Sequence, residues 1–418
     1  MNLLWFHLMP YMDLPEDFRE KHNSVWVDID SRLFNPERAH HMYHDFISEL
    51  EFAAECGFDA ICVNEHHSNG YGMMPSPNLI AATLARSTQD AAICVMGNSL
   101  ALYNPPTRIA EEMAMIDCIS GGRLIAGFPV GTPMDTCYAY GQNPSMLRDR
   151  YYEAHDLIMK AWQTPEPFAF NGRYNKQAFV NVWPRPVQKP HPPIWIPGGG
   201  SVETWQWCAE NDYVYAFLSY YGYLAGTQVM QGFWNEMDRI GKDRNPYRAA
   251  FLQFVGVAET REEAMELYKE PAEYFYGRSL HVDPTYARPP GYTTEATLRA
   301  KIQSQVAAAA GIKEDVTNPI PTTATEMEDI VKNGYVIVGS PDEVAEQLRH
   351  VATEMNVGHL MLLLQYGNMN TELTRYNTKL FADKVMPQLK GLHSEWEDKW
   401  WPTSMKSPRT VPASAAAE

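Results

Sequence analysis

Glu65, His66 and His67 form the densest group of chemically active side chains in this 418-residue sequence. They follow a short apolar run, Asp59 to Val63, which predicts a strand buried on both faces. A histidine at the end of such a strand can act as an acid or a base near neutral pH. We therefore predict that these three residues are catalytic, with a hydrogen-bonded structural pair as the alternative.

A catalytic metal is not expected here. Metal hydrolases need three or four converging ligands, and the adjacent His66 and His67 point to opposite sides if the chain is extended. His40 and His44 have helical spacing, but the HExxH pattern is missing, so we expect them at the surface.

A second motif, the run from Gly198 to Ser201, follows a predicted strand and opens a predicted helix. Glycines let the backbone approach a ligand, and a helix N-terminus offers free N–H groups that bind phosphate. The alternative is a tight turn followed by an N-cap serine. Gly97 and Asn98 lie within a third predicted strand, where a glycine often marks a bulge or a close ligand approach.

The elements that must position these residues alternate along the chain. Apolar runs predict strands at 2–9, 59–63, 91–102, 123–128, 193–197, 213–218, 249–258, 334–338 and 358–365. Periodicity and caps predict helices between them, among them 36–56, 77–88, 148–162, 224–240 and 372–388. Such alternation is typical of an α/β fold with a parallel sheet, and about eight units favour one closed (β/α)₈ TIM barrel. An open dinucleotide-binding sheet is disfavoured, because no Gly-rich fingerprint follows the first strand.

We assign the barrel to residues 1–390 and a C-terminal tail to 391–418. Two stretches exceed a minimal barrel: 165–192, before the fifth strand, and 281–333, after the seventh helix. Long excursions in a barrel are usually lids or substrate walls. Because the active site lies at the C-terminal strand ends, His7, His66, Gly97 and the glycine run should share one face. That convergence predicts a phosphate-bearing cofactor across the barrel mouth.

Composition narrows the class of protein further. Lys plus Arg is 34 and Asp plus Glu is 51, a net charge of −17 that argues against a nucleic-acid or anionic-membrane surface. The six cysteines have irregular spacing, which favours free thiols in a reducing compartment. Neither a signal peptide nor a membrane-length apolar run is found, so we expect a cytoplasmic protein.

Several motifs together resemble the bacterial luciferase-like, flavin-dependent monooxygenases. These are EFAAECGFDAICVNEHH (51–67), NPPTRIAEEMAMIDCISGGRLIAGFPVG (104–131), NVWPRPVQKPHPPIWIPGGGSVETWQW (181–207) and VGSPDEVAEQL (338–348). The resemblance covers about residues 1–390, with 281–333 poorly matched. It implies a (β/α)₈ barrel, a homodimer, reduced FMN (FMNH₂) from a separate flavin reductase, and molecular oxygen as co-substrate. In that family a flavin C4a-hydroperoxide then attacks a small organic substrate.

The resemblance also implies roles for single residues. His66 stands at the position of the family's catalytic histidine, with His67 beside it and Glu65 before it. Gly97 and Asn98 match the place of a non-prolyl cis peptide beside the flavin ring. The positions that match cofactor-binding segments at the ends of strands four and five are Pro129, Val130, Gly199, Gly200 and Ser201.

The sequence departs from the family at strand four. Val130 replaces an arginine that contacts the phosphate in some members, and Pro129 replaces the reactive cysteine of luciferase itself. The departure argues against light emission. It also assigns the phosphate to backbone N–H groups or to another cation, such as Arg148 or Arg150.

Two other functions stay open on the same fold. One is deazaflavin (F420)-dependent hydride transfer, which Glu65-His66-His67 disfavours relative to FMN. The other is a non-catalytic flavin-binding protein. The substrate is expected to be a mostly apolar aldehyde, ketone, alkane-like or aromatic compound, and hydroxylation, Baeyer–Villiger insertion and oxidative cleavage all remain open. Candidate pocket residues are His7, Tyr71, Met73, Met74 and Tyr103.

Overall fold

Eight parallel strands close into a barrel in the computed structural model, which describes residues 1–218, 220–299, 302 and 324–405. The closing pairs are β8 with β9 and β11 with β1. All eight strands are buried along nearly their whole length, which explains their continuous apolar runs. In chain order they are β1 (Asn2–Phe6), β2 (Ala60–Val63), β3 (Ala92–Val95), β4 (Leu124–Gly127), β7 (Ile194–Gly198), β8 (Val214–Phe217), β9 (Ala249–Val257) and β11 (His359–Leu363).

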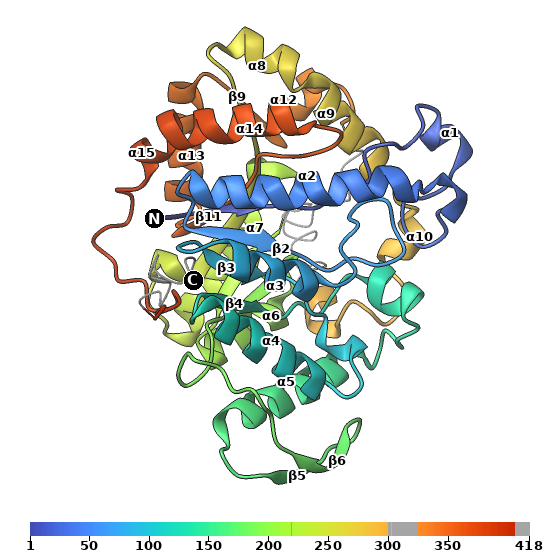
Figure 1. The fold of residues 1–418 in the computed structure, drawn as a ribbon, viewed down its shortest axis with the longest axis vertical. Helices are drawn as coiled ribbons and strands as arrows, with labels where there is room; N and C mark the ends of the chain where they lie inside the picture. The colour runs from blue at the N-terminus through green and yellow to red at the C-terminus, as the bar shows by residue number, and fades with distance from the viewer. Residues whose placement is uncertain (219, 300–301, 303–323, 406–418) are drawn as a thin grey trace, which may run out of the picture.

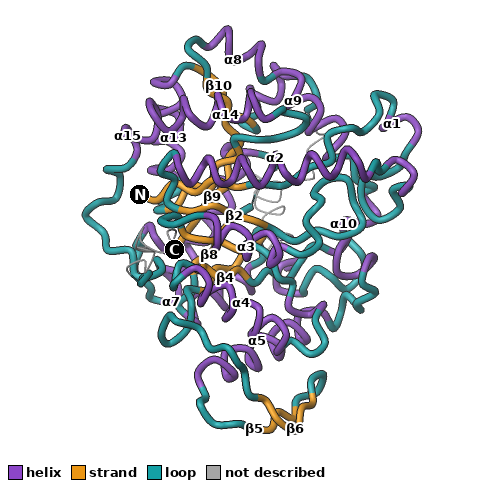
Figure 2. The backbone as a smooth tube through the Cα atoms, viewed as in Figure 1, coloured by secondary structure: helices purple, strands orange, loops and turns teal. Residues whose placement is uncertain are grey.

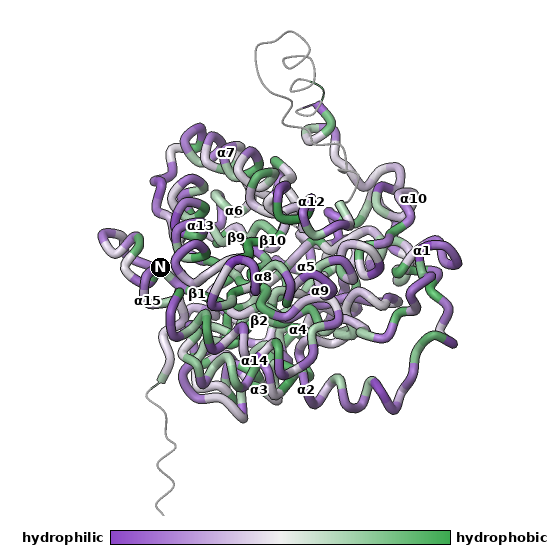
Figure 3. Tube along the Cα trace, turned by 90° about the horizontal axis from the view of Figure 1, so that it is seen from above, coloured by the Kyte–Doolittle hydropathy of each residue, from purple (hydrophilic) through white to green (hydrophobic). Residues whose placement is uncertain are grey.

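Helices surround this barrel, as Figure 1 and Figure 2 show. The predicted TIM barrel is therefore confirmed. In Figure 3, hydrophobic residues concentrate in the interior and hydrophilic ones on the outer helix faces. The covering helices are α2 (Pro36–Glu55), α3 (Pro77–Ser87), α4 (Thr107–Ser120), α5 (Leu147–Gln163), α6 (Val202–Asn211), α7 (Gly222–Ile240), α8 (Arg261–Leu267), α9 (Lys269–Tyr274), α13 (Pro341–Glu354), α14 (Thr371–Leu380) and α15 (Met386–Leu389).

Local sequence explains where several helices begin. The Asn35 side chain accepts hydrogen bonds from the backbone N–H groups of Glu37 and Arg38, which caps α2. At α13, Ser340 and Glu343 form the reciprocal capping box that the sequence predicts.

Two predicted strands differ from the structure. The third, expected over 91–102, ends at Val95, and a 3₁₀ turn occupies Leu100–Leu102. The strand expected at 334–338 is β10 (Val336–Gly339), which lies outside the closed barrel and pairs only with β9. This is possible because β9 has nine residues, so its C-terminal half extends past β8 and offers a free edge.

The two long excursions and the tail have their own structure. Within 165–192, β5 (Phe168–Asn171) and β6 (Lys176–Val180) form an antiparallel hairpin that projects from the barrel. In 281–333, the described parts include α10 (Pro284–Ala287) and α12 (Met327–Lys332), and most of the helix expected near 294–310 lies outside the described residues. The described part of the tail packs against the barrel: the Trp400 indole donates to the Asp212 carbonyl. Among the described helices, none combines the length and apolarity that crossing a membrane requires.

Candidate active site

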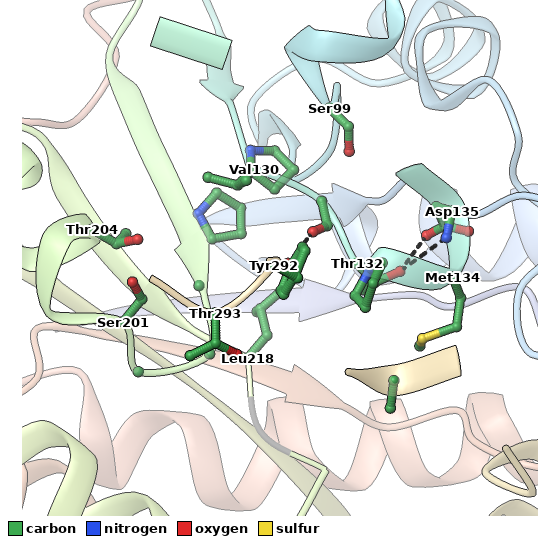
Figure 4. A pocket seen from close by; sticks show the side chains of 18 of the residues that line it. Ser99, Val130, Thr132, Met134, Asp135, Ser201, Thr204, Leu218, Tyr292 and Thr293 are labelled. Carbon is green, nitrogen blue, oxygen red and sulfur yellow. Dashed lines mark hydrogen bonds between the residues drawn. The ribbon is translucent and has the colours of Figure 1, made fainter. Parts of the chain in front are cut away.

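A cavity of about 430 Å³ opens at the C-terminal ends of β2, β3, β4, β7 and β8. Figure 4 shows Ser201 and Thr204 on one side of it and Thr132, Met134 and Asp135 on the other. Val130 and Tyr292 lie between the two sides. The cavity therefore connects the two motifs that the sequence singles out, Glu65-His66-His67 and the glycine run.

His66 faces this cavity and is oriented by a carboxylate. Its Nδ1 lies 2.9 Å from Oδ2 of Asp135, a residue 69 positions away in the sequence. The Trp26 ring packs edge-on against the imidazole at a centroid distance of 4.9 Å. An ionised carboxylate only accepts, so Nδ1 carries a proton, and Nε2 is the acceptor when the imidazole is neutral.

Asp135 is held by three further donors. Its Oδ1 accepts from the Trp26 indole at 2.9 Å and from the backbone N–H of His67 at 2.7 Å, and its Oδ2 accepts from the Thr132 hydroxyl at 2.9 Å. Burial raises the pKa of Asp135, but attraction to His66 and the hydrogen bonds outweigh it, so the pKa lies below its usual value. The sequence gives little sign of this residue beyond its position in the loop after the fourth strand.

The side chains of Glu65 and His67 bond to each other, whereas the His66 ring bonds to Asp135. Glu65 Oε1 accepts from His67 Nε2 and from the Tyr103 hydroxyl, both at 2.8 Å, and Oε2 accepts from the Ser99 backbone N–H at 2.8 Å. His67 is not among the residues that line the cavity. The pair therefore fastens the end of β2 to the loop after β3. Glu65 also lines the cavity, and a catalytic role for either residue stays a prediction.

Gly97 and Asn98 lie behind the cavity wall rather than in it. The peptide bond between them is trans, contrary to the expectation from the resemblance; the cis bonds of the described chain precede prolines 105, 184 and 190. A Cβ on Gly97 would lie 2.5 Å from the backbone nitrogen of Glu65. The close approach that the glycine allows is thus to the neighbouring strand end. Asn98 donates from Nδ2 to the Tyr103 hydroxyl at 3.2 Å.

The Gly198–Ser201 turn lines the other end of the cavity at the N-terminus of α6. Gly200 has a φ of +93°, which an L side chain rarely adopts. Arg148, from α5, reaches this turn: Nη2 lies 3.3 Å from Ser201 Oγ and Nη1 lies 3.4 Å from Thr204 Oγ1. Arg150 points elsewhere, with its guanidinium 4.7 Å from the centre of the Tyr174 ring. Of the two cations considered from the sequence, Arg148 reaches the turn.

Described residues of the second long excursion, 281–333, border the same cavity. The Tyr292 hydroxyl donates to the Gly131 carbonyl at 2.5 Å, and the hydroxyls of Thr294 and Thr297 donate to the Glu203 carboxylate. Burial raises the pKa of Glu203, but these bonds and one from Ser201 outweigh it and lower the pKa. The segment therefore connects the loop after β4 to the start of α6.

The predicted substrate residues lie outside the cavity lining. His7 is fully buried, with Nδ1 accepting from the Met9 backbone N–H and Nε2 3.1 Å from Glu49. Tyr71 stacks on Trp26 behind His66. Tyr103 is bonded to Glu65, while Met73 and Met74 are buried and bonded through their backbones. Pro129 and Val130 do line the cavity, together with Met96, Leu218, Tyr220 and Tyr292.

The described residues contain no group of three or more His, Cys, Asp or Glu side chains that could hold a metal ion.

Comparisons with known proteins give a matching family model and several related sequences. A family model described as luciferase-like monooxygenase matches residues 31–357. The oxygenase component of a flavin-dependent trigonelline monooxygenase from Acinetobacter baylyi is 28% identical over 180 residues, which is 41% of this chain and 48% of that protein. Limonene 1,2-monooxygenase from Rhodococcus erythropolis is 23% identical over 362 residues, 83% of this chain and 82% of the relative.

Several of the sequence matches cover only part of the related protein. The match to a solved structure covers nearly the whole of both chains. The matched region spans about half the length of several curated relatives. The oxygenating constituent of 3,6-diketocamphane monooxygenase from Pseudomonas putida, solved with FMN, has a TM-score of 0.64 at 20% identity, covering 93% of this chain and 98% of that one. At that identity the likeness shows the fold.

Proposed function

This chain belongs to the luciferase-like monooxygenase family, and on that premise we propose that it is the oxygenase of a two-component system. It binds reduced FMN and uses molecular oxygen to oxidise a small organic substrate. The observation that carries the proposal is the single cavity that joins His66, held by Asp135, to the glycine turn with Arg148.

The residues at the glycine turn fit an FMN phosphate. The N-terminus of the ten-residue helix α6 offers backbone N–H groups and a favourable dipole. Arg148 supplies the cation that Val130 does not. The Glu203 carboxylate opposes an anion here, but its oxygens are already bonded to Ser201, Thr294 and Thr297.

Reduced FMN, when bound, supplies the electrons that activate oxygen. The chain supplies the surroundings for that chemistry. His66 Nε2 accepts a proton or a hydrogen bond, because Asp135 holds the other ring nitrogen in its protonated form. Met96, Val130, Leu218 and Tyr292 form an apolar wall that excludes water from the reacting groups.

A two-component oxygenase requires a separate flavin reductase as its partner. The trigonelline relative is named as an oxygenase component, which supports a two-component arrangement. We propose that the reductase supplies FMNH₂ by diffusion or transient contact, and that the substrate enters beside His66.

We further propose that the chain forms a homodimer through an apolar stripe on α3, α4, β6 and the segment that follows β6. Its members are the exposed side chains Leu79, Met115, Ile119, Phe179 and Trp183. Phe179 is 81% exposed and Trp183 is 79% exposed, unusual values for large aromatic side chains.

The elements that carry the stripe are bonded side by side. Asn78 of α3 donates to Glu112 of α4 at 2.7 Å. Gln177 donates to Thr107 at the start of α4, and Cys118 near its end donates to the Arg185 carbonyl. Residues 177–185 therefore run along α4. A self-complementary patch of this kind suits a two-fold dimer.

An anaerobic titration tests the cofactor. Reduced FMN, oxidised FMN and reduced F420 are added in parallel, and binding is followed by the fluorescence of the 11 tryptophans. We expect the strongest binding for reduced FMN. Preference for F420 would instead indicate hydride transfer, and binding of none of the three would contradict a flavin enzyme.

A second experiment tests catalysis. The protein is supplied with a flavin reductase, NADH, FMN and a substrate panel that includes trigonelline and limonene, and oxygenated product is measured. His66→Ala should still bind reduced FMN, though more weakly, and should lose product formation. A variant that keeps both would support the non-catalytic flavin-binding alternative.

A further inference from the structure

Asn64 is a buried amide in the cavity that lacks a partner. It is the first residue after β2 and is 3% exposed. Its Oδ1 has no hydrogen-bond partner among the described residues, although the side chain lines the cavity. Leaving a buried polar atom unsatisfied costs stability, so such an atom is expected to serve a ligand.

His66 follows Asn64 by two residues and offers a second acceptor. The proton on Nδ1 is donated to Asp135, which leaves Nε2 with a lone pair. Both side chains line the cavity, whereas the oxygens of Glu65 between them are bonded to His67, Tyr103 and Ser99. Asn64 Oδ1 and His66 Nε2 are thus the two acceptors at this strand end for which the described residues provide no partner.

We propose that Asn64 Oδ1 and His66 Nε2 form an acceptor pair that selects ligands bearing N–H or O–H donors. Building on the proposed function, the pair selects reduced over oxidised FMN, because reduction turns the N5 acceptor of the isoalloxazine ring into an N–H donor. A hydroxyl or amine of the organic substrate carries the same donor chemistry and is the second source. An aldehyde or ketone does not, so the pair disfavours part of the substrate range expected from the sequence.

The first experimental arm addresses the flavin. Reduced and oxidised FMN are titrated anaerobically into the wild type, Asn64→Leu and Asn64→Asp. Leucine keeps the branched shape of asparagine but has no polar atom, and aspartate keeps an acceptor oxygen. We expect Asn64→Leu to lose about tenfold in affinity for reduced FMN, the size of one hydrogen bond, with oxidised FMN little changed. Asn64→Asp should keep the preference for reduced FMN.

The second arm addresses the substrate. Phenol and methoxybenzene, which differ in one hydroxyl hydrogen and a methyl group, are titrated into the FMN-loaded protein. If Asn64→Leu abolishes a preference for phenol and leaves the flavin preference intact, the donor comes from the substrate. If Asn64→Leu loses the preference for reduced over oxidised FMN, the donor belongs to FMN. No change in either arm would overturn the acceptor pair.

The free energy of unfolding distinguishes a ligand-binding role of Asn64 from a structural role. Because Oδ1 is unsatisfied, Asn64→Leu should leave the free energy of unfolding of the ligand-free protein unchanged or raised. A marked loss would mean that the amide supports the fold. Asn98→Leu is the matched control: Asn98 is also buried with an unpartnered Oδ1, but it lies outside the cavity lining and bonds Tyr103. It should lose stability without changing either ligand preference.

The same titrations distinguish a failure of the acceptor pair from a failure of the proposed function. A wild type that binds FMN in neither state would overturn the proposed function and this inference with it. A wild type that prefers reduced FMN, matched by an equal preference in Asn64→Leu, would overturn the acceptor pair alone.

Discussion

At the scale of single residues, Asp135 organises the site. It accepts hydrogen bonds from an indole, a hydroxyl, a backbone N–H and the His66 ring, each from a different residue. Four donors fix both carboxylate oxygens, so the imidazole has one favoured tautomer and one favoured direction. The chemistry assigned to His66 depends on this carboxylate.

Replacing Asp135 with asparagine should cost about 2 kcal/mol of unfolding free energy at pH 7, because charged hydrogen bonds in a buried site are lost. The pKa of Asp135 is lowered from 3.8 in the folded protein, so the carboxylate stabilises the fold above that pH. This contribution is lost as the pH falls through the lowered value. Urea unfolding of both proteins from pH 7 to pH 3 should therefore show the difference shrinking.

Asp156→Asn is the control for that measurement. Asp156 also faces a histidine, His155 at 3.3 Å, but its side chain is 73% exposed. We expect a change close to zero at every pH. An equal loss in both variants would contradict the special role of Asp135.

Arg148 should account for much of the phosphate affinity. Arg148→Ala is expected to raise the Kd for FMN about 10- to 100-fold and to leave riboflavin, which lacks the phosphate, nearly unchanged. Arg150→Ala is the matched control, since that guanidinium lies over Tyr174. Both ligands can be titrated by tryptophan fluorescence, and an equal effect of the two substitutions would refute the assignment.

At the scale of elements, the site depends on how closely β2 and β3 approach where they end. The Glu65 carboxylate bridges this junction by accepting from the Ser99 backbone and the Tyr103 hydroxyl. Gly97 makes the junction possible, because a larger residue would meet the Glu65 backbone. The loops that carry His66 and Ser99 are therefore positioned by packing rather than by their own sequence preferences.

Gly97→Ala should lower the free energy of unfolding by about 1–3 kcal/mol, because the new Cβ would meet backbone atoms that cannot move aside. Gly199→Ala is the control, since a Cβ there meets no atom within 4 Å and the φ of Gly199 is not in the left-handed region. Chemical denaturation measures both. Equal stability of the two variants would show that the junction can relax.

At the scale of the whole molecule, the apolar stripe is the surface through which we propose that two chains associate. Its borders carry both signs of charge, with Arg108 paired to Glu112 on α4. A two-fold copy of such a border is self-complementary despite the net charge of −17.

Trp183→Asp should convert the proposed dimer to a monomer, because a carboxylate would be buried without a partner in the interface. Light scattering after gel filtration should give the mass of one chain, 47.5 kDa, instead of twice that mass. Leu224→Asp on α7, an exposed leucine away from the stripe, should leave the mass unchanged. A wild type with the mass of one chain would contradict the dimer.

The sequence by itself determined the barrel and the place of the site. Strand and helix periodicities are local properties, and parallel strands of a barrel must end on one face, so Glu65-His66-His67 and the glycine turn had to lie near each other. Glycines and caps likewise mark their turns from local preferences alone.

The tertiary structure decided which side chains face the cavity and which partners they have. Asp135 meets His66 across 69 residues, and Arg148 rather than Arg150 reaches Ser201 because the phase of α5 is set by packing. None of the residues expected at the substrate, His7, Tyr71, Met73, Met74 and Tyr103, lines the cavity. Tyr71 packs against His66 and Tyr103 bonds to Glu65, two residues that do line it. Sequence spacing places a residue near a site, but side-chain direction depends on the packing of neighbouring loops and helices, which local pattern does not encode.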